Sequence, residues 1–428
     1  MDREPNTSTP FAIRSGFTDL RMEILRERGA RLHFVSRYGD AVKPSTCACP
    51  RITVNDVSEA IVTTTPLHPG VGRPSRARLA VLNAASAVSL RLLPRIPDPV
   101  KRLLLGRRSV TVDGNTLDTT VQLMLALQRS AGTGGFIASN DLSVARSQLR
   151  KLATFVTAAI AVGVHDLTVS GGAGELRARH YVPVNAIGSE PLLVFYHGGG
   201  FVVGDIDTHD TVCRLICRDA AVHVLSVDYR LAPEHPAPAG VEDAYAAYRW
   251  AVDHAAELGA DPNRVAVGGD SAGGNLAAVV SRLARNEGAP IPALQLLIYP
   301  LTSSFLTDTR SKTLFADGFF LTKADIDWCG EVYLGGAAID ASDPRISPLL
   351  DDDLSGLPPA LVVTAGFDPL RDEGNQYAEA LAAAGVSVDH RQFGSLIHGF
   401  TNFFPLGGDS ASATAELISA LRAHLSRA

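Results

Sequence analysis

The chain has 428 residues, of which 46% are hydrophobic and 20% are charged, and its formal net charge is -6. This apolar content suffices for a large core and excludes a globally disordered chain. The mildly acidic balance argues against a nucleic-acid partner, because nucleic-acid binders normally carry a basic surface. The length exceeds that of an average domain, yet α/β folds of this size occur as single units.

Residues 1–75 are expected to form a poorly ordered N-terminal extension. Arg, Thr and Pro are frequent there, no helical or strand period persists, and Thr65–Arg76 has the composition of a linker. Met1–Ala30 is rich in charged residues and lacks a continuous apolar run, so no secretory signal is predicted. The five cysteines are odd in number and lack disulfide-type spacing, which fits reduced thiols and a cytoplasmic location. No metal site is predicted, since neither His nor a second Cys pair accompanies Cys213 and Cys217.

Residues 76–163 are expected to form an N-terminal helical cap region. Helical patterns are predicted at Leu79–Leu93, Thr116–Gln128 and Asp141–Ile160, with prolines ending the first. Leu79–Leu93 is too short and too interrupted by polar residues to span a bilayer. It could lie on a membrane surface, although packing on the protein's own core is the more ordinary explanation, so no firm membrane contact is predicted. A helical block ahead of an α/β domain is a candidate lid.

Residues 164–428 alternate short apolar runs with helical patterns. The first runs predict a strand pair around a Gly turn, and the later ones predict buried strands separated by helices. The expected strands are 192–197, 222–229, 264–269, 294–300, 360–366 and 386–393, and the expected helices include 241–258, 375–385 and 412–425. Such alternation predicts an α/β fold with a mostly parallel sheet covered on both faces. Ligands then bind at the carboxyl ends of the strands.

The segment Gly269-Asp270-Ser271-Ala272-Gly273 contains the pattern Gly-x-Ser-x-Gly between a predicted strand and a predicted helix. In a nucleophile elbow the flanking positions must be small, because strand and helix approach closely around a strained serine. Neither a G-x-G-x-x-G fingerprint nor a P-loop is present, which disfavours nucleotide binding. Ser271 is therefore the candidate nucleophile.

A second glycine-rich segment, His197-Gly198-Gly199-Gly200, directly follows the predicted strand at 192–197. Consecutive glycines free the backbone to turn several N–H groups toward one point, as stabilisation of an oxyanion requires. Gly199 and Gly200, together with Ala272, are the expected oxyanion-hole donors. His197 is expected to be structural, in support of the loop.

A serine nucleophile needs a base, and the base needs an acid to orient it, usually in the chain order Ser, acid, His. Of the histidines after Ser271, His398 falls in the loop after the last predicted strand, whereas His390 lies inside that strand and His424 in the terminal helix. His398 is therefore the expected base. Asp368 directly follows a predicted strand and is the expected acid. Its rivals Asp372 and Glu373 suit the first turn of a helix.

With these residues identified, the chain resembles the bacterial hormone-sensitive-lipase-like carboxylesterases, in the branch whose nucleophile motif is GDSAG. The resemblance spans residues 164–428 and rests on HGGG (197–200), DYRLAPE (228–234), GDSAGGN (269–275), DPLRDEG (368–374) and HGF (398–400). The helical region before residue 160 resembles the cap of mycobacterial members. The resemblance implies an α/β-hydrolase fold, hydrolysis of short- to medium-chain esters, and a second cap segment placed at 302–334. It also implies that Asp270 is a supporting residue, and a homodimer is compatible with it.

This chemistry calls for a small-molecule ester substrate and no metal or organic cofactor. A lipase acting on longer-chain lipid esters is an alternative, with Phe201, Phe315, Phe319 and Phe320 as candidate lining of an acyl pocket. Phe residues beside a core are more usually part of that core. An alternative of another class is a non-catalytic small-molecule binder on the same scaffold, which the presence of Ser271, Asp368 and His398 disfavours.

Overall fold

The computed structural model describes the strands at 10–13, 20–26 and 32–36, and residues 92–427 apart from 131–134, 138, 185–187 and 304. The chain divides into two compact units, Met1–Arg76 and Ala77–Ala428. In the first unit, β1 (Pro10–Ile13), β2 (Leu20–Arg26) and β3 (Leu32–Ser36) form an antiparallel sheet. The sequence did not predict these strands. The remainder of the expected extension, and nearly all of the helix expected at 79–93, lie outside the described residues.

The second unit is built on an eight-stranded sheet in the order β13-β12-β11-β10-β8-β9-β7-β6. Five neighbouring pairs, from β13 to β9, are parallel, and β7 pairs antiparallel with both β9 and β6. The strands are β6 (Gly163–Gly171), β7 (Gly174–Val182), β8 (Glu190–Tyr196), β9 (His223–Val227), β10 (Ala260–Asp270), β11 (Gln295–Ile298), β12 (Ala360–Phe367) and β13 (Val388–Ile397). This is the mostly parallel α/β-hydrolase sheet that the sequence predicted.

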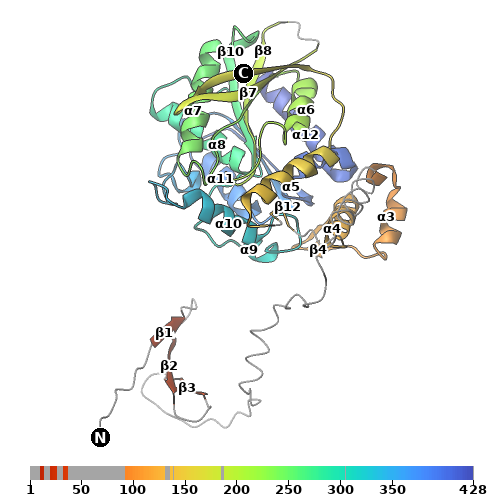
Figure 1. Cartoon of the computed structure of the whole chain (residues 1–428), viewed down its shortest axis with the longest axis vertical. Coiled ribbons are helices and arrows are strands. Elements are labelled where there is room, and N and C mark those ends of the chain that lie inside the picture. Colours follow the sequence, from red (N-terminus) through yellow and green to blue (C-terminus); the bar gives the residue numbers. More distant parts are fainter. Residues whose placement is uncertain are drawn as a thin grey trace. The chain divides into compact units, whose positions relative to one another are not determined.

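Helices cover both faces of this sheet (Figure 1). Successive residues of β8 alternate between two core clusters: Leu192 and Val194 pack with α7, α8 and α11, whereas Leu193 and Phe195 pack with α6 and α12. A strand buried on both faces needs no polar residues, which is why β8 is a continuous apolar run. The covering helices are α6 (Asp210–Ala220), α7 (Ala239–His254), α8 (Ala272–Asn286), α11 (Arg371–Ala383) and α12 (Gly408–Leu425).

Two groups of elements stand where the cap was predicted. The first comprises η1 (Leu93–Arg95), α3 (Asp98–Leu104), β4 (Thr111–Val112), β5 (Asn115–Thr116), α4 (Thr119–Ser130) and α5 (Leu142–Phe155), and the second comprises α9 (Arg310–Leu314) and α10 (Lys323–Leu334). The carboxylate of Asp325 on α10 accepts the backbone N–H groups of Phe136 and Ile137, at 3.3 and 3.1 Å. The two groups are therefore in direct contact. No helix among the described residues is long and apolar enough to cross a membrane.

Three further short turns lie near the last strands in the chain. They are η2 (Pro348–Leu350), η3 (Phe400–Asn402) and η4 (Phe404–Leu406). Asp270, Asp368 and His398 stand at or immediately after the ends of β10, β12 and β13, which are close in the sheet. A parallel sheet brings these ends to one edge, so residues about 130 positions apart in the chain meet there.

Candidate active site

Ser271 occupies a sharp turn between β10 and α8. Its backbone has φ 56° and ψ -119°, a conformation that non-glycine residues rarely adopt. A Cβ added at Gly269 would lie 2.4 Å from the carbonyl oxygen of Tyr196, and one added at Gly273 would lie 1.9 Å from the same oxygen. The two glycines are thus required for β8, β10 and α8 to approach closely, and the turn exposes the serine side chain to a cavity.

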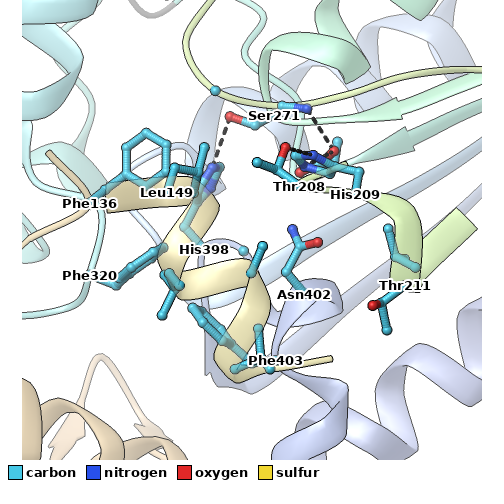
Figure 2. Close-up of a pocket in the computed structure, with 18 of the residues that line it drawn as sticks. Phe136, Leu149, Thr208, His209, Thr211, Ser271, Phe320, His398, Asn402 and Phe403 are labelled. Atoms are coloured by element: carbon cyan, nitrogen blue, oxygen red, sulfur yellow. Dashed lines mark hydrogen bonds and ion pairs between the residues drawn. The ribbon is translucent and has the colours of Figure 1, made fainter. Parts of the chain in front are cut away.

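A chain of hydrogen bonds joins the three residues predicted as nucleophile, base and acid. His398 Nε2 lies 2.9 Å from Ser271 Oγ (Figure 2), and His398 Nδ1 lies 2.7 Å from Asp368 Oδ2. Because a carboxylate only accepts, Nδ1 carries the imidazole proton, and the lone pair of Nε2 faces the serine hydroxyl. Asp368 is fully buried, and its other oxygen accepts the Leu370 N–H at 2.8 Å. The arrangement can remove the proton of Ser271.

The rival residues lie elsewhere. His390 Nε2 contacts the Thr364 hydroxyl at 3.3 Å, and His424 pairs with Asp389 at 3.1 Å. Asp372 and Glu373 lie in the first turn of α11, as the sequence predicted. Neither they nor the two histidines line the cavity at Ser271.

The glycine-rich loop after β8 forms a tight turn. Gly199 has φ 127°, and its carbonyl accepts the N–H groups of Val202 and Val203 at 3.1 and 3.0 Å. A Cβ at Gly199 would lie 2.0 Å from the Val203 carbonyl oxygen, and one at Gly200 would lie 2.5 Å from Cys329 Sγ. Both positions therefore exclude a side chain.

Among the three expected oxyanion donors, Gly199 lines the cavity beside Ser271. Gly200 packs against α10 through Cys329, and Ala272 is fully buried at the start of α8. Their role as N–H donors to an oxyanion stays a prediction.

His197 supports the loop from behind. Its Nδ1 donates to the Gly198 carbonyl at 2.8 Å, and its ring stacks on Tyr229 with a centroid separation of 4.4 Å. Complete burial, with His209 nearby, lowers the pKa of His197 to about 4, so it is neutral. On the other side of the loop, the carboxylate of Asp270 accepts the Gly198 N–H at 2.9 Å. The contacts of both residues are those of a support for the loop.

The cavity at Ser271 is open and measures about 680 Å³. One wall is aliphatic and comes from one face of α5 and the residue after it: Leu149, Leu152, Ala153 and Val156. A second is aromatic: Phe136, Phe320, Phe403 and Phe404. A third wall carries polar side chains: Thr208, His209, Thr211 and Asn402 (Figure 2).

Of the four phenylalanines predicted to line an acyl pocket, only Phe320 does so. Phe201 stacks on Tyr333 with ring centroids 4.0 Å apart, and Phe315 and Phe319 pack against Phe367. These three therefore belong to or pack against the hydrophobic core, which was the ordinary alternative for them.

Sequence reasoning missed the polar wall and the α5 face. The amphipathic pattern of Asp141–Ile160 indicated a helix but not the surface on which it packs. The only signal for His209 was its place in a polar stretch, Asp205–Asp210, soon after the glycine-rich loop.

Comparison with known proteins agrees with this geometry. A family model described as the alpha/beta hydrolase fold matches residues 193–402. The chain is 57% identical over 367 residues to the carboxylic ester hydrolase LipN of Mycobacterium tuberculosis, covering 84% of this chain and 97% of that protein. It is 44% identical over 292 residues to the carboxylesterase NlhH of the same species, covering 67% of this chain and 91% of NlhH.

Solved structures of ester hydrolases are also similar to this chain. The ester hydrolase EH1AB1, from the metagenome of Lake Arreo, superposes with a TM-score of 0.68 at 42% identity, covering 72% of this chain and 99% of that one. The thermostable carboxylesterase EstE1, cloned from a metagenomic library, superposes with a TM-score of 0.64 at 43% identity, covering 67% and 98%.

Proposed function

Because this chain belongs to the α/β-hydrolase family, in its hormone-sensitive-lipase-like branch of carboxylic ester hydrolases, we propose that Ser271, His398 and Asp368 are its catalytic triad. The observation that carries the proposal is the hydrogen-bond chain from Ser271 Oγ through His398 to the buried Asp368, beside a cavity that Ser271 and His398 line. The enzyme is a serine carboxylesterase.

In the proposed reaction, His398 Nε2 takes the proton of Ser271 as Oγ forms a bond to the ester carbonyl carbon. Asp368 holds the imidazole in the required tautomer and stabilises the imidazolium that forms. When the tetrahedral intermediate collapses, the bond to the alcohol oxygen breaks and His398 protonates the departing alcohol. Water, activated by the same base, then cleaves the acyl-enzyme.

The oxyanion of each tetrahedral intermediate requires N–H donors that are already oriented. We assign this role to the backbone N–H groups of Gly199, Gly200 and Ala272. The assignment is supported by the turn at Gly199, which is fixed by two hydrogen bonds, and by the start of α8 at Ala272, since the N-terminus of a helix favours negative charge.

The cavity supports small substrates with short- to medium-length acyl chains. The side chains of α5 form one wall of it, so a long chain would meet that helix. Most lining side chains are apolar, which suits an alkyl or aryl substituent on either side of the ester.

The direct test is hydrolysis of p-nitrophenyl esters from acetyl to palmitoyl by the wild type and by Ser271→Ala. We expect a maximum at short or medium chains and a loss of several orders of magnitude in the variant. A maximum at long chains would favour a lipase. No hydrolysis of any ester by the wild type, or equal rates in the variant, would refute the proposed function. The homodimer and the cytoplasmic location stay predictions, which sedimentation equilibrium and cell fractionation test.

A further inference from the structure

A second buried histidine–aspartate pair lies in the wall of the cavity, and the reaction described above does not use it. His209, at the start of α6, has Nε2 3.2 Å from Oδ1 of Asp270, the last residue of β10. Both side chains are 5% exposed, and both residues line the cavity next to Ser271. Figure 2 shows His209 beside Ser271. Buried ionisable groups in a catalytic cavity call for a functional explanation.

The hydrogen bonds around His209 determine its protonation. The Thr208 hydroxyl donates its only proton to the carbonyl oxygen of Asp205 at 2.7 Å, and it accepts the Asp205 N–H at 2.9 Å. At its 2.9 Å contact with His209 Nδ1, the hydroxyl can therefore only accept, so Nδ1 is the donor. The Nε2 atom faces a carboxylate, which also only accepts. This arrangement favours a proton on each ring nitrogen, and therefore an imidazolium at His209.

The charged groups around the His209 ring also favour its protonated form. Burial by itself lowers the pKa of His209, but Asp270 and, more weakly, Asp205 outweigh burial, so the pKa is raised. Burial likewise opposes ionisation of Asp270, but His209 and the Gly198 N–H outweigh it and lower its pKa. The neighbouring His197 is neutral, and the centroid of its ring lies 5.6 Å from that of His209. His209 and Asp270 thus hold opposite charges inside the protein.

The same carboxylate reaches the oxyanion loop. Asp270 Oδ1, which pairs with His209, also accepts the Gly198 N–H at 2.9 Å. The contact is close: a Cβ added at Gly198 would lie 2.6 Å from Asp270 Oδ2. The peptide unit held in this way immediately precedes the one that carries the N–H of Gly199, the first expected oxyanion donor.

We propose that His209 and Asp270 are positioning residues for ester hydrolysis, in which a permanently charged His209 keeps Asp270 ionised so that its carboxylate fixes the oxyanion loop at Gly198. Without the imidazolium, the buried carboxylate would lack a counter-ion and would tend to take up a proton, which weakens its hold on the Gly198 N–H. Oxyanion stabilisation depends on donors that do not need to reorganise. The inference rests on the proposed function of the loop.

The charge state is tested first, in a measurement that does not depend on activity. The intact protein, labelled with ¹⁵N at its 12 histidines, is examined by two-bond ¹H–¹⁵N correlation between pH 6 and 9. The His209 signals, identified by their loss in His209→Asn, are expected to show two protonated ring nitrogens up to pH 8. In Asp270→Asn the same ring is expected to become neutral within this range. A neutral His209 at pH 8 in the wild type would overturn the proposal.

The positioning role is tested by kinetics and by a trifluoromethyl ketone inhibitor, which adds to the serine and places an oxyanion in the same loop. In His209→Asn and Asp270→Asn, we expect kcat to fall by about ten- to a hundredfold, less than the loss of an oxyanion donor itself, with KM within about threefold. Inhibitor affinity should fall by about the same factor as kcat.

The matched control is His180→Asn, which removes another buried, paired imidazole that does not line the cavity. It should leave kcat and inhibitor affinity within about twofold of wild type, even if the melting temperature falls. A purely structural role for His209 would lower the melting temperature and leave both quantities unchanged, which would overturn the proposal. Failure of the proposed function would be seen separately, as an absence of ester hydrolysis by the wild type.

Discussion

Replacing Asp368 with Asn removes a single charge at the most buried position of the proposed triad. Asp368 Oδ1 accepts the Leu370 N–H at 2.8 Å, so the amide oxygen of Asn is expected to keep this place. Its NH₂ group then points at His398 Nδ1, 2.7 Å away in the wild type. Since NH₂ only donates, the imidazole must move its proton to Nε2, which faces Ser271 Oγ at 2.9 Å. In this tautomer His398 cannot act as a base.

The expected loss follows from this change of tautomer. In serine hydrolases an Asp-to-Asn change that leaves the geometry intact lowers kcat by about 10⁴, which corresponds to ~5 kcal/mol of transition-state stabilisation. KM should change little, because the ground-state ester touches neither Asp368 nor the proton on His398. The fold should persist, because Asn has the same size and retains the hydrogen bond to Leu370.

The assay is steady-state hydrolysis of p-nitrophenyl butyrate at pH 8, with circular dichroism as a check of folding. Asp372→Asn is the matched control, since Asp372 is the rival acid and its carboxylate bonds to Ser311 and Arg371 outside the cavity. It should retain activity within about threefold, as is usual for a change away from the reacting atoms. An Asp368→Asn enzyme within tenfold of wild type would refute the reasoning, and a large loss in Asp372→Asn alone would transfer the role to that residue.

Three further predictions concern the loop, the pH dependence of stability and the cavity. Gly199→Ala places a Cβ only 2.0 Å from the carbonyl oxygen of Val203, so the loop must shift and kcat/KM should fall by about 10²–10³. A fully active variant would show that the loop can shift without losing its N–H donors. The pKa of His180 is lowered to about 4 by burial and by His223 and His165. As pH falls, the imidazole of His180 therefore binds a proton in the unfolded chain before it does so in the folded protein. The contribution of this site to the free energy of unfolding is complete above about pH 6.5 and is lost as pH falls toward 4. Between pH 7 and 5, the neutral His180 should lower the free energy of unfolding by roughly 2 kcal/mol, as measured by urea denaturation. In His180→Asn the fall in this free energy should be smaller. An equal fall in both proteins would contradict the assignment. The Asn402 amide lines the cavity, and within the described residues it has no hydrogen-bond partner (Figure 2). Asn402→Leu should therefore raise kcat/KM for hexanoate relative to acetate esters by up to about tenfold, and an unchanged ratio would show that acyl chains do not reach it.

Some features could be read from the sequence because they are local requirements of the backbone. Gly269 and Gly273 flank Ser271 because only glycine tolerates the close approach of β8, β10 and α8. Continuous apolar runs predicted the buried parallel strands, because a strand covered on both faces has no polar side. The positions of Asp368 and His398 followed from chain order, since each comes directly after a strand whose carboxyl end lies at the same edge of the sheet.

Other features depend on which surfaces pack together, and no local pattern contains that information. The strands β1 to β3, of 4, 7 and 5 residues, were not predicted. The cavity wall from α5 and the orientation of Phe320, in contrast to Phe315 and Phe319, depend on contacts between distant segments. The sequence by itself determined the proposed triad residues, because the turn at Ser271 and the strand ends before Asp368 and His398 are local features of the backbone. Only the tertiary structure brought His209 to Asp270, because an ion pair between a loop and a strand end 61 positions later depends on how the sheet and its helices pack.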